Sequence, residues 1–182
     1  MLDLRKFGDP VWPKELMPIG IDGLTKESYE DWRTLVGDEI HHLHPEISEQ
    51  WIYRHWTQSP LSFLAIPDLE WREEIWTPDQ FLAEVRTWRG NEPLNPEFDY
   101  GVFHQFGTHP TAEALDNGAW DYAPIVLSTP EGFIDTIGEK VDARYLLVEG
   151  HQRRRYLNAL VTRGAKLPPQ RVFVLSIPIV NQ

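Results

Sequence analysis

Five consecutive residues are suited to binding an anion or to proton transfer: Glu149, Gly150, His151, Gln152 and Arg153. They follow a mostly apolar run of the length expected for a buried strand, residues 144–148, and precede apolar residues at helical spacing that end at Gly164. This pattern predicts a strand, a tight glycine turn and a helix. Because the first N–H groups of a helix have no partner within it, the turn is expected to bind a phosphate or another anion.

Each residue of the turn has a predicted role. Gly150 would let the backbone approach a phosphate, and Arg153 would hold the phosphate with paired hydrogen bonds. His151 and Gln152 would donate hydrogen bonds or transfer a proton. Two interpretations of Glu149 stay open. In one it holds a magnesium ion or acts as a general base, and in the other it pairs with a nearby arginine and orients it.

The distribution of charge points to the same turn. Residues 144–171 contain seven Lys or Arg and one acid, a net charge of +6, whereas the rest of the chain contains ten Lys or Arg and 27 acids, a net charge of −17. A focused anion-binding patch on an acidic body would have this distribution, and so would a solvated basic helix face. Within the patch we expect Arg153 to contact the ligand and Arg154 to point elsewhere on the helix.

The turn, between a hydrophobic strand and a helix, resembles the Gly-x-x-Arg signature of the ParB/sulfiredoxin superfamily. Upstream, residues 114–118 and 124–126 are similar to that family's helix, glycine and Pro-Ile-Val strand, so the resemblance spans residues 100–177. It implies a bacterial protein that binds nucleotide phosphates at the turn, because family members with a Gly-His-x-Arg turn bind them there. A nucleoside triphosphate with Mg²⁺ is the cofactor that this resemblance implies.

Two activities of that family do not fit the sequence. The sulfiredoxin reaction needs a cysteine inside the turn, and the chain has no cysteine. ParB proteins that clamp DNA join this domain to a helix-turn-helix module, which we do not expect after Ile177, so nucleic acid is not the favoured ligand.

The remaining elements predict an α/β (α+β) fold in two parts. Residues 1–95 would form a helical, aromatic-rich subdomain, and residues 96–182 the ParB/sulfiredoxin-like domain, with 91–99 as a linker. Strands near 124–127, 144–148 and 171–177 would share one small mixed sheet. The helix over 152–163 would pack on this sheet through Tyr156, Leu157 and Leu160. Further helices are expected over 77–90, over about two turns after Pro110, and from 129 to Gly138, with a short strand or loop over 100–107.

The N-terminal half is rich in aromatic and histidine residues. Six of the eight tryptophans precede residue 77, and we expect some of them in a partner or homodimer interface. The cluster His41, His42 and His44 has metal-ligand residue types but no obvious carboxylate partner, so no metal site is assigned. His104 and His109 are expected to face the turn. Without a signal-peptide pattern or an apolar run of about 18 residues, we expect a cytoplasmic protein with no membrane partner.

Three functions remain as hypotheses. The first is a nucleotide- or phosphate-binding domain that acts as a nucleotide hydrolase or phosphotransferase. The second is a metal-dependent ParB-like nuclease, for which the sequence offers no convincing acidic cluster near Gly150. The third is a non-enzymatic module that binds a protein partner through the aromatic half.

Overall fold

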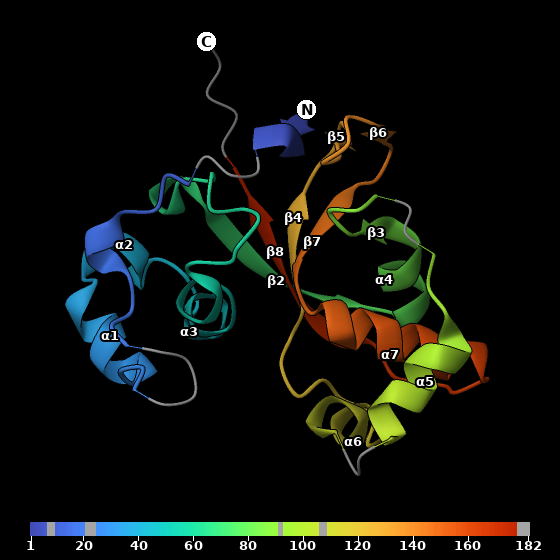
Figure 1. Ribbon diagram of the computed structural model, residues 1–182. Helices are drawn as coiled ribbons and strands as arrows, with labels where there is room; N and C mark the ends of the chain where they lie inside the picture. Colours follow the sequence, from blue (N-terminus) through green and yellow to red (C-terminus); the bar gives the residue numbers. More distant parts are fainter. Residues whose placement is uncertain (7–9, 21–24, 91–92, 106–108, 178–182) are drawn as a thin grey trace.

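A five-stranded mixed sheet with helices on both faces forms the centre of the molecule (Figure 1). The computed structural model describes residues 1–182 except 7–9, 21–24, 91–92, 106–108 and 178–182. The strands are β1 (Leu2–Asp3), β2 (Glu70–Trp76), β3 (Val85–Arg86), β4 (Ile125–Ser128), β5 (Phe133–Ile134), β6 (Lys140–Val141), β7 (Tyr145–Glu149) and β8 (Gln170–Ser176). The α-helices are α1 (Tyr29–Leu35), α2 (Asp38–His41), α3 (Pro45–Ile47), α4 (Pro78–Glu84), α5 (Pro96–His104), α6 (Pro110–Asp116) and α7 (His151–Thr162). Short 3₁₀ turns cover Leu4–Lys6, Lys14–Leu16 and Ile66–Asp68, and a π-helical segment, Ser48–Tyr53, continues α3.

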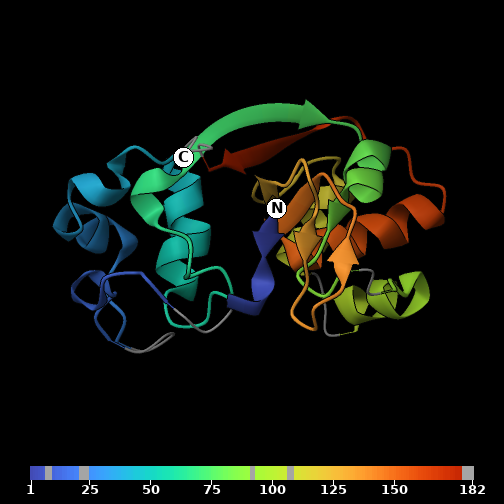
Figure 2. The same ribbon diagram turned by 90° about the horizontal axis from the view of Figure 1, so that it is seen from above.

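The strand order of the large sheet is β2-β8-β4-β7-β3. β2 runs antiparallel to β8 over seven residue pairs, from Glu70 opposite Ser176 to Trp76 opposite Gln170. β4 is parallel to β8 and antiparallel to β7, and β3 is parallel to β7. Figure 2 shows that β2 and β8 extend across the molecule and connect its two helical groups. A smaller sheet joins β1, β5 and β6 in the order β1-β5-β6.

The two faces of the large sheet belong to two hydrophobic cores. Successive side chains of a strand point to opposite faces. Ile125, Leu127 and Phe173 accordingly pack with α1–α3 and the π-helical segment, whereas Val126 and Val172 pack with α4–α7. The predicted sheet is confirmed, because β4, β7 and β8 neighbour one another in it. The predicted helix is also confirmed, and the residues expected to pack it are buried in the second core: Tyr156, Leu157 and Leu160.

The sheet includes strands from both sides of residue 95. β2 and β3 come from the N-terminal half and pair with β8 and β7. The predicted division into residues 1–95 and 96–182 therefore does not coincide with a break in the sheet. The group α1–α3 and the π-helical segment fits the description of a helical part, and it packs on one face of the shared sheet.

Three local predictions are wrong. Residues 96–104 form α5, where a linker over 91–99 and a short strand or loop over 100–107 were expected; Asn95 accepts a hydrogen bond from the N–H of Phe98 at the start of this helix. The helix expected from 129 to Gly138 is a hairpin, because Phe133 pairs with Val141 and β1 adds to its other edge. The helix expected over 77–90 ends at Glu84, where the chain enters β3 beside β7.

Most of the N-terminal tryptophans lie in the core. Those at 8% exposure or less are Trp12, Trp32, Trp51, Trp56 and Trp76. Trp71 is partly buried and packs against the first core. The indole rings are therefore used for internal packing, which leaves little of their surface for a partner. In the described part of the chain, no helix has the length and apolar character needed to cross a membrane.

Candidate functional site

The predicted strand, glycine turn and helix are present at the end of β7. Glu149 is the last residue of β7, Gly150 is the N-cap, and α7 begins at His151. Gly150 has φ 105°, a left-handed conformation that glycine adopts without a steric cost. It carries no side chain that could cap α7. The first N–H groups of a helix have no acceptor within the helix itself, so this end of α7 offers hydrogen-bond donors. A 12-residue helix also places partial positive charge at this end.

Two observations make Gly150 sensitive to substitution. A Cβ atom there would lie 3.1 Å from Cβ and 3.3 Å from Cα of Pro124, and φ is positive. We expect Gly150→Ala to lower the free energy of unfolding by about 1–2 kcal/mol from the left-handed conformation, and further through the contact with Pro124. The matched control is Gly164→Ala, where φ is 86° but no atom lies within 4 Å of the added carbon. Urea titrations of both variants test this, and equal losses would show that Pro124 does not crowd the turn.

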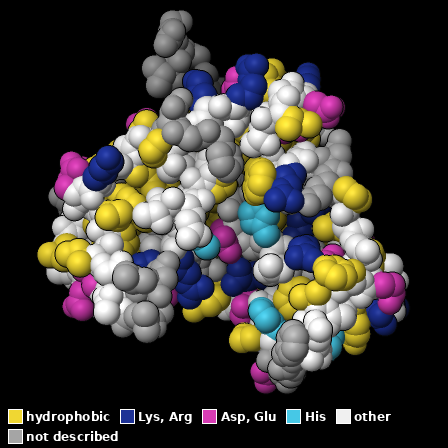
Figure 3. Space-filling view, viewed as in Figure 1, with side chains coloured by type: hydrophobic (Ala, Val, Ile, Leu, Met, Phe, Trp, Pro, Cys, Tyr) yellow, Lys and Arg dark blue, Asp and Glu magenta, His cyan; other side chains and the backbone are white. Residues whose placement is uncertain are grey.

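A cavity of about 410 Å³ opens beside the first turn of α7. We call it the α7 cavity. Its walls come from three segments: the residues after β3, the residues before and at the start of α5, and the first two turns of α7. The lining residues are Thr87, Trp88, Arg89, Pro93, Leu94, Asn95, Phe98, Asp99, His151, Gln152, Arg154 and Arg155. Figure 3 shows basic, acidic and histidine side chains gathered at the centre of this face of the molecule.

The charged residues in the described lining of the α7 cavity are mostly cationic. Arg89, Arg154 and Arg155 line it, and Asp99 is the acidic residue among the described lining. Arg154 is 6% exposed and Asp99 2% exposed, so both belong to the inner wall. Asp99 Oδ1 accepts hydrogen bonds from Nε and Nη2 of Arg155, the first at 2.8 Å. The Nη1 atom of Arg155 also donates to Oε1 of Gln152 at 3.4 Å.

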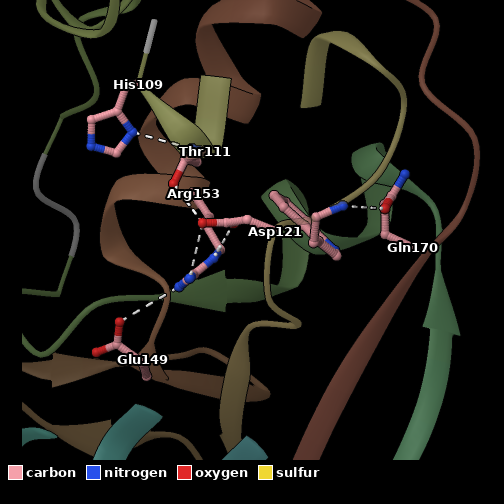
Figure 4. A network of polar contacts seen from close by, with 7 residues as sticks. His109, Thr111, Asp121, Glu149, Arg153 and Gln170 are labelled. Atoms are coloured by element: carbon pink, nitrogen blue, oxygen red, sulfur yellow. Dashed lines mark hydrogen bonds and ion pairs between the residues drawn. The ribbon is translucent and has the colours of Figure 1, made fainter. Parts of the chain in front are cut away.

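Arg153 points away from the α7 cavity. Its Nε donates to Oδ1 of Asp121 at 2.7 Å and its Nη2 to Oδ2 at 3.3 Å, while Nη1 lies 3.6 Å from Oε1 of Glu149 (Figure 4). The guanidinium also lies over the ring of Tyr122, 5.5 Å from its centroid. Asp121 accepts a further hydrogen bond from the hydroxyl of Thr111 at 3.0 Å. Arg153 is thus held in a buried ion pair that joins α7 to the segment before β4.

The structure separates the five residues of the predicted site into two groups. Gly150 supports the turn, and His151 and Gln152 line the α7 cavity. Glu149 and Arg153 lie in the ion-pair network on the other side of the turn. There Glu149 Oε2 is 3.4 Å from Nε2 of His55. The position of Glu149 therefore matches the interpretation in which it pairs with an arginine.

The other histidines that the sequence singled out make local structural contacts. His104 Nε2 lies 2.8 Å from the hydroxyl of Tyr156, and His109 accepts a hydrogen bond from the N–H of Thr111 at the start of α6. Neither lines the α7 cavity. In the upstream cluster, His44 accepts a hydrogen bond from the N–H of Glu46. Among the described residues, no group of three His, Cys, Asp or Glu side chains is arranged to hold a metal ion.

Four residues of the α7 cavity were missed from sequence: Arg89, Asp99, Arg154 and Arg155. One signal for two of them was available. In a helix, positions three and four residues apart share a face. His151, Arg154 and Arg155 share such a face, whereas Arg153 does not belong to it. Arg89 and Asp99 come from distant segments and had no local signal.

The comparison of the chain with protein-family models found no match, and neither did the comparisons with curated proteins and with solved structures. The resemblance to the ParB/sulfiredoxin superfamily therefore stays a prediction. What the site does is argued below from its own geometry.

Proposed function

We propose that this chain binds a phosphate-bearing ligand, a nucleotide or another phosphate ester, in the α7 cavity. The observation that carries the proposal is the convergence of Arg89, Arg154 and Arg155 on the cavity that the N-terminus of α7 borders. Guanidinium groups form strong, directional hydrogen bonds with phosphate oxygens, and helix N–H groups add donors. The volume of about 410 Å³ lies in the range of small-molecule sites.

The apolar part of the α7 cavity favours an ester over inorganic phosphate. Trp88, Leu94 and Phe98 line it together with the arginines. Phe98 is 60% exposed, so its ring offers apolar surface to a bound ligand. An organic group joined to the phosphate would cover this wall while the arginines hold the anion. A nucleotide has both parts.

Turnover of the ligand, as a hydrolase or phosphotransferase, would require a proton acceptor near the bound phosphate. His151 is the histidine of the described cavity lining, whereas Glu149 lies outside it. Because the described residues supply no cluster for a metal ion, a magnesium ion would be held mainly by the phosphates of the ligand. No observation specifically favours a nuclease, and the burial of the tryptophans gives no support to a partner-binding module.

Arg154→Gln is expected to weaken binding of the best nucleoside triphosphate about tenfold to a hundredfold, because a hydrogen bond to a charged group contributes about 1.5–3 kcal/mol. A thermal-shift screen with and without magnesium selects the ligand, and isothermal titration measures the affinity. The matched control is Arg163→Gln, which removes a cation from the far end of α7, where Arg163 pairs with Glu97 at 2.7 Å. Unchanged affinity in a folded Arg154→Gln protein would remove the α7 cavity as the binding site.

A further inference from the structure

Asp99 is the feature of the α7 cavity that phosphate binding leaves unexplained. Its side chain is 2% exposed, and its Oδ1 atom accepts both hydrogen bonds from Arg155. Its Oδ2 atom is fully buried and has no hydrogen-bond partner among the described residues. A buried polar atom without a partner destabilises the fold, and the cost is higher for a charged group. Because Asp99 is one of the residues that line the α7 cavity, a donor on a bound ligand could satisfy this acceptor.

The charge of the site narrows the kind of donor. A phosphate oxygen beside Oδ2 would repel it, since both carry negative charge. A metal cation there would lie close to Arg155, which already donates to the same carboxylate, and beside Arg89 and Arg154 on the same cavity. A neutral hydroxyl or amine avoids both conflicts, because it donates a hydrogen bond without bringing a like charge to the arginines.

We infer that Asp99 selects, among phosphate esters, those that carry a hydroxyl donor next to the phosphate, as the ribose of a nucleotide does. This inference rests on the proposed function, since it concerns the same cavity. In this arrangement the anion is held by Arg154 and Arg155 of α7 and by Arg89, which follows β3. The sugar hydroxyl donates a hydrogen bond to Oδ2 of Asp99. Asp99 is then a specificity-determining residue, with Arg155 fixing the orientation of its carboxylate.

The first test compares ligands on the unaltered protein by isothermal titration. Adenosine monophosphate is compared with its 2′,3′-dideoxy analogue, which keeps the ring and the phosphate but lacks the hydroxyls, and with methyl phosphate. We expect the dideoxy analogue to bind about tenfold more weakly, the size of one hydrogen bond to a charged group. Equal affinity for the two nucleotides would overturn the inference and leave the proposed function standing. Failure of all three ligands to bind would overturn both.

The second test replaces the acceptor. Asp99→Asn keeps the shape and one oxygen for Arg155 but turns the second position into a donor. We expect the preference for the hydroxylated nucleotide to disappear and methyl phosphate to bind more tightly than to the unaltered protein. Glu97→Gln is the matched control, with the same change of charge on the same helix but at a side chain that is 77% exposed and outside the cavity. A preference that persists in folded Asp99→Asn protein, or vanishes equally in Glu97→Gln, would overturn the inference.

Discussion

Arg153→Ala is expected to lower the free energy of unfolding by about 2–3 kcal/mol. Removing one partner of a fully buried ion pair costs about 3–5 kcal/mol. The expected loss here is smaller because the Asp121 side chain keeps 19% of its surface exposed. The Arg153 side chain is 9% exposed and its contacts with Asp121 would all be lost. Urea unfolding followed by circular dichroism measures the effect.

The same variant should change the dependence of stability on pH. Burial alone raises the pKa of Asp121, but the hydrogen bonds and charge of Arg153 outweigh it, so the net pKa lies below its usual value. A carboxyl with a lowered pKa in the folded state stabilises the fold above its unfolded pKa, about 3.9, and this contribution is lost as the pH falls through the folded value. In Arg153→Ala, burial remains and favours the protonated acid. The difference in stability between the two proteins should therefore narrow below about pH 4.

A double-mutant cycle with Asp121→Asn separates the ion pair from other losses. If the pair is responsible, Arg153→Ala should cost much less in the Asp121→Asn background than in the unaltered protein. An equal cost in both backgrounds, with no narrowing in acid, would assign the loss to packing on Tyr122, whose ring lies 5.5 Å from the guanidinium carbon. The sequence predicted another outcome for Arg153→Ala, a loss of ligand affinity with an intact fold.

The two expectations differ for a geometric reason. The apolar run, Gly150 and the helical spacing are local signals, and together they predicted the strand, turn and helix that the structure contains. Which arginine faces the cavity depends on the rotation of α7 on the sheet, and that is fixed by the burial of Tyr156 and Leu157. The partners of the arginines are distant in sequence: Asp121 is 32 residues from Arg153, and Asp99 is 56 from Arg155. Neither separation leaves a pattern in a single sequence.

The wrong elements have a similar explanation. Asn95 and Pro96 form a helix start, a cap followed by proline at the first position, whereas the proline and asparagine content of 91–99 predicts a linker. The hairpin of β5 and β6 replaces an expected helix because β1, from the other end of the chain, pairs with β5. Long-range strand pairing overrides local helical spacing here, and the same pairing draws β2 and β3 into the central sheet.

The second large effect concerns the tryptophans, which the sequence assigned in part to an interface. Trp51→Ala is expected to lower the free energy of unfolding by about 3–5 kcal/mol, as for other buried aromatic residues cut to alanine. The Trp51 side chain is 1% exposed, its ring centroid lies 5.5 Å from that of Trp12, and its Nε1 donates to Oγ of Ser59 at 2.9 Å. The cavity left behind and the loss of the hydrogen bond to Ser59 both add to the loss of stability.

The two interpretations of Trp51, as a core residue or as an interface residue, predict different results for Trp51→Ala. If Trp51 is a core residue, urea unfolding by circular dichroism shows the large loss, and light scattering on the folded fraction gives the same mass as the unaltered protein. Ile137→Ala is the surface control, because Ile137 is 78% exposed and its replacement should change stability by less than about 0.5 kcal/mol. A Trp51→Ala protein with near-normal stability but an altered mass in light scattering would show that Trp51 lies in an interface. A ring that stabilises association contributes little to the stability of the isolated fold.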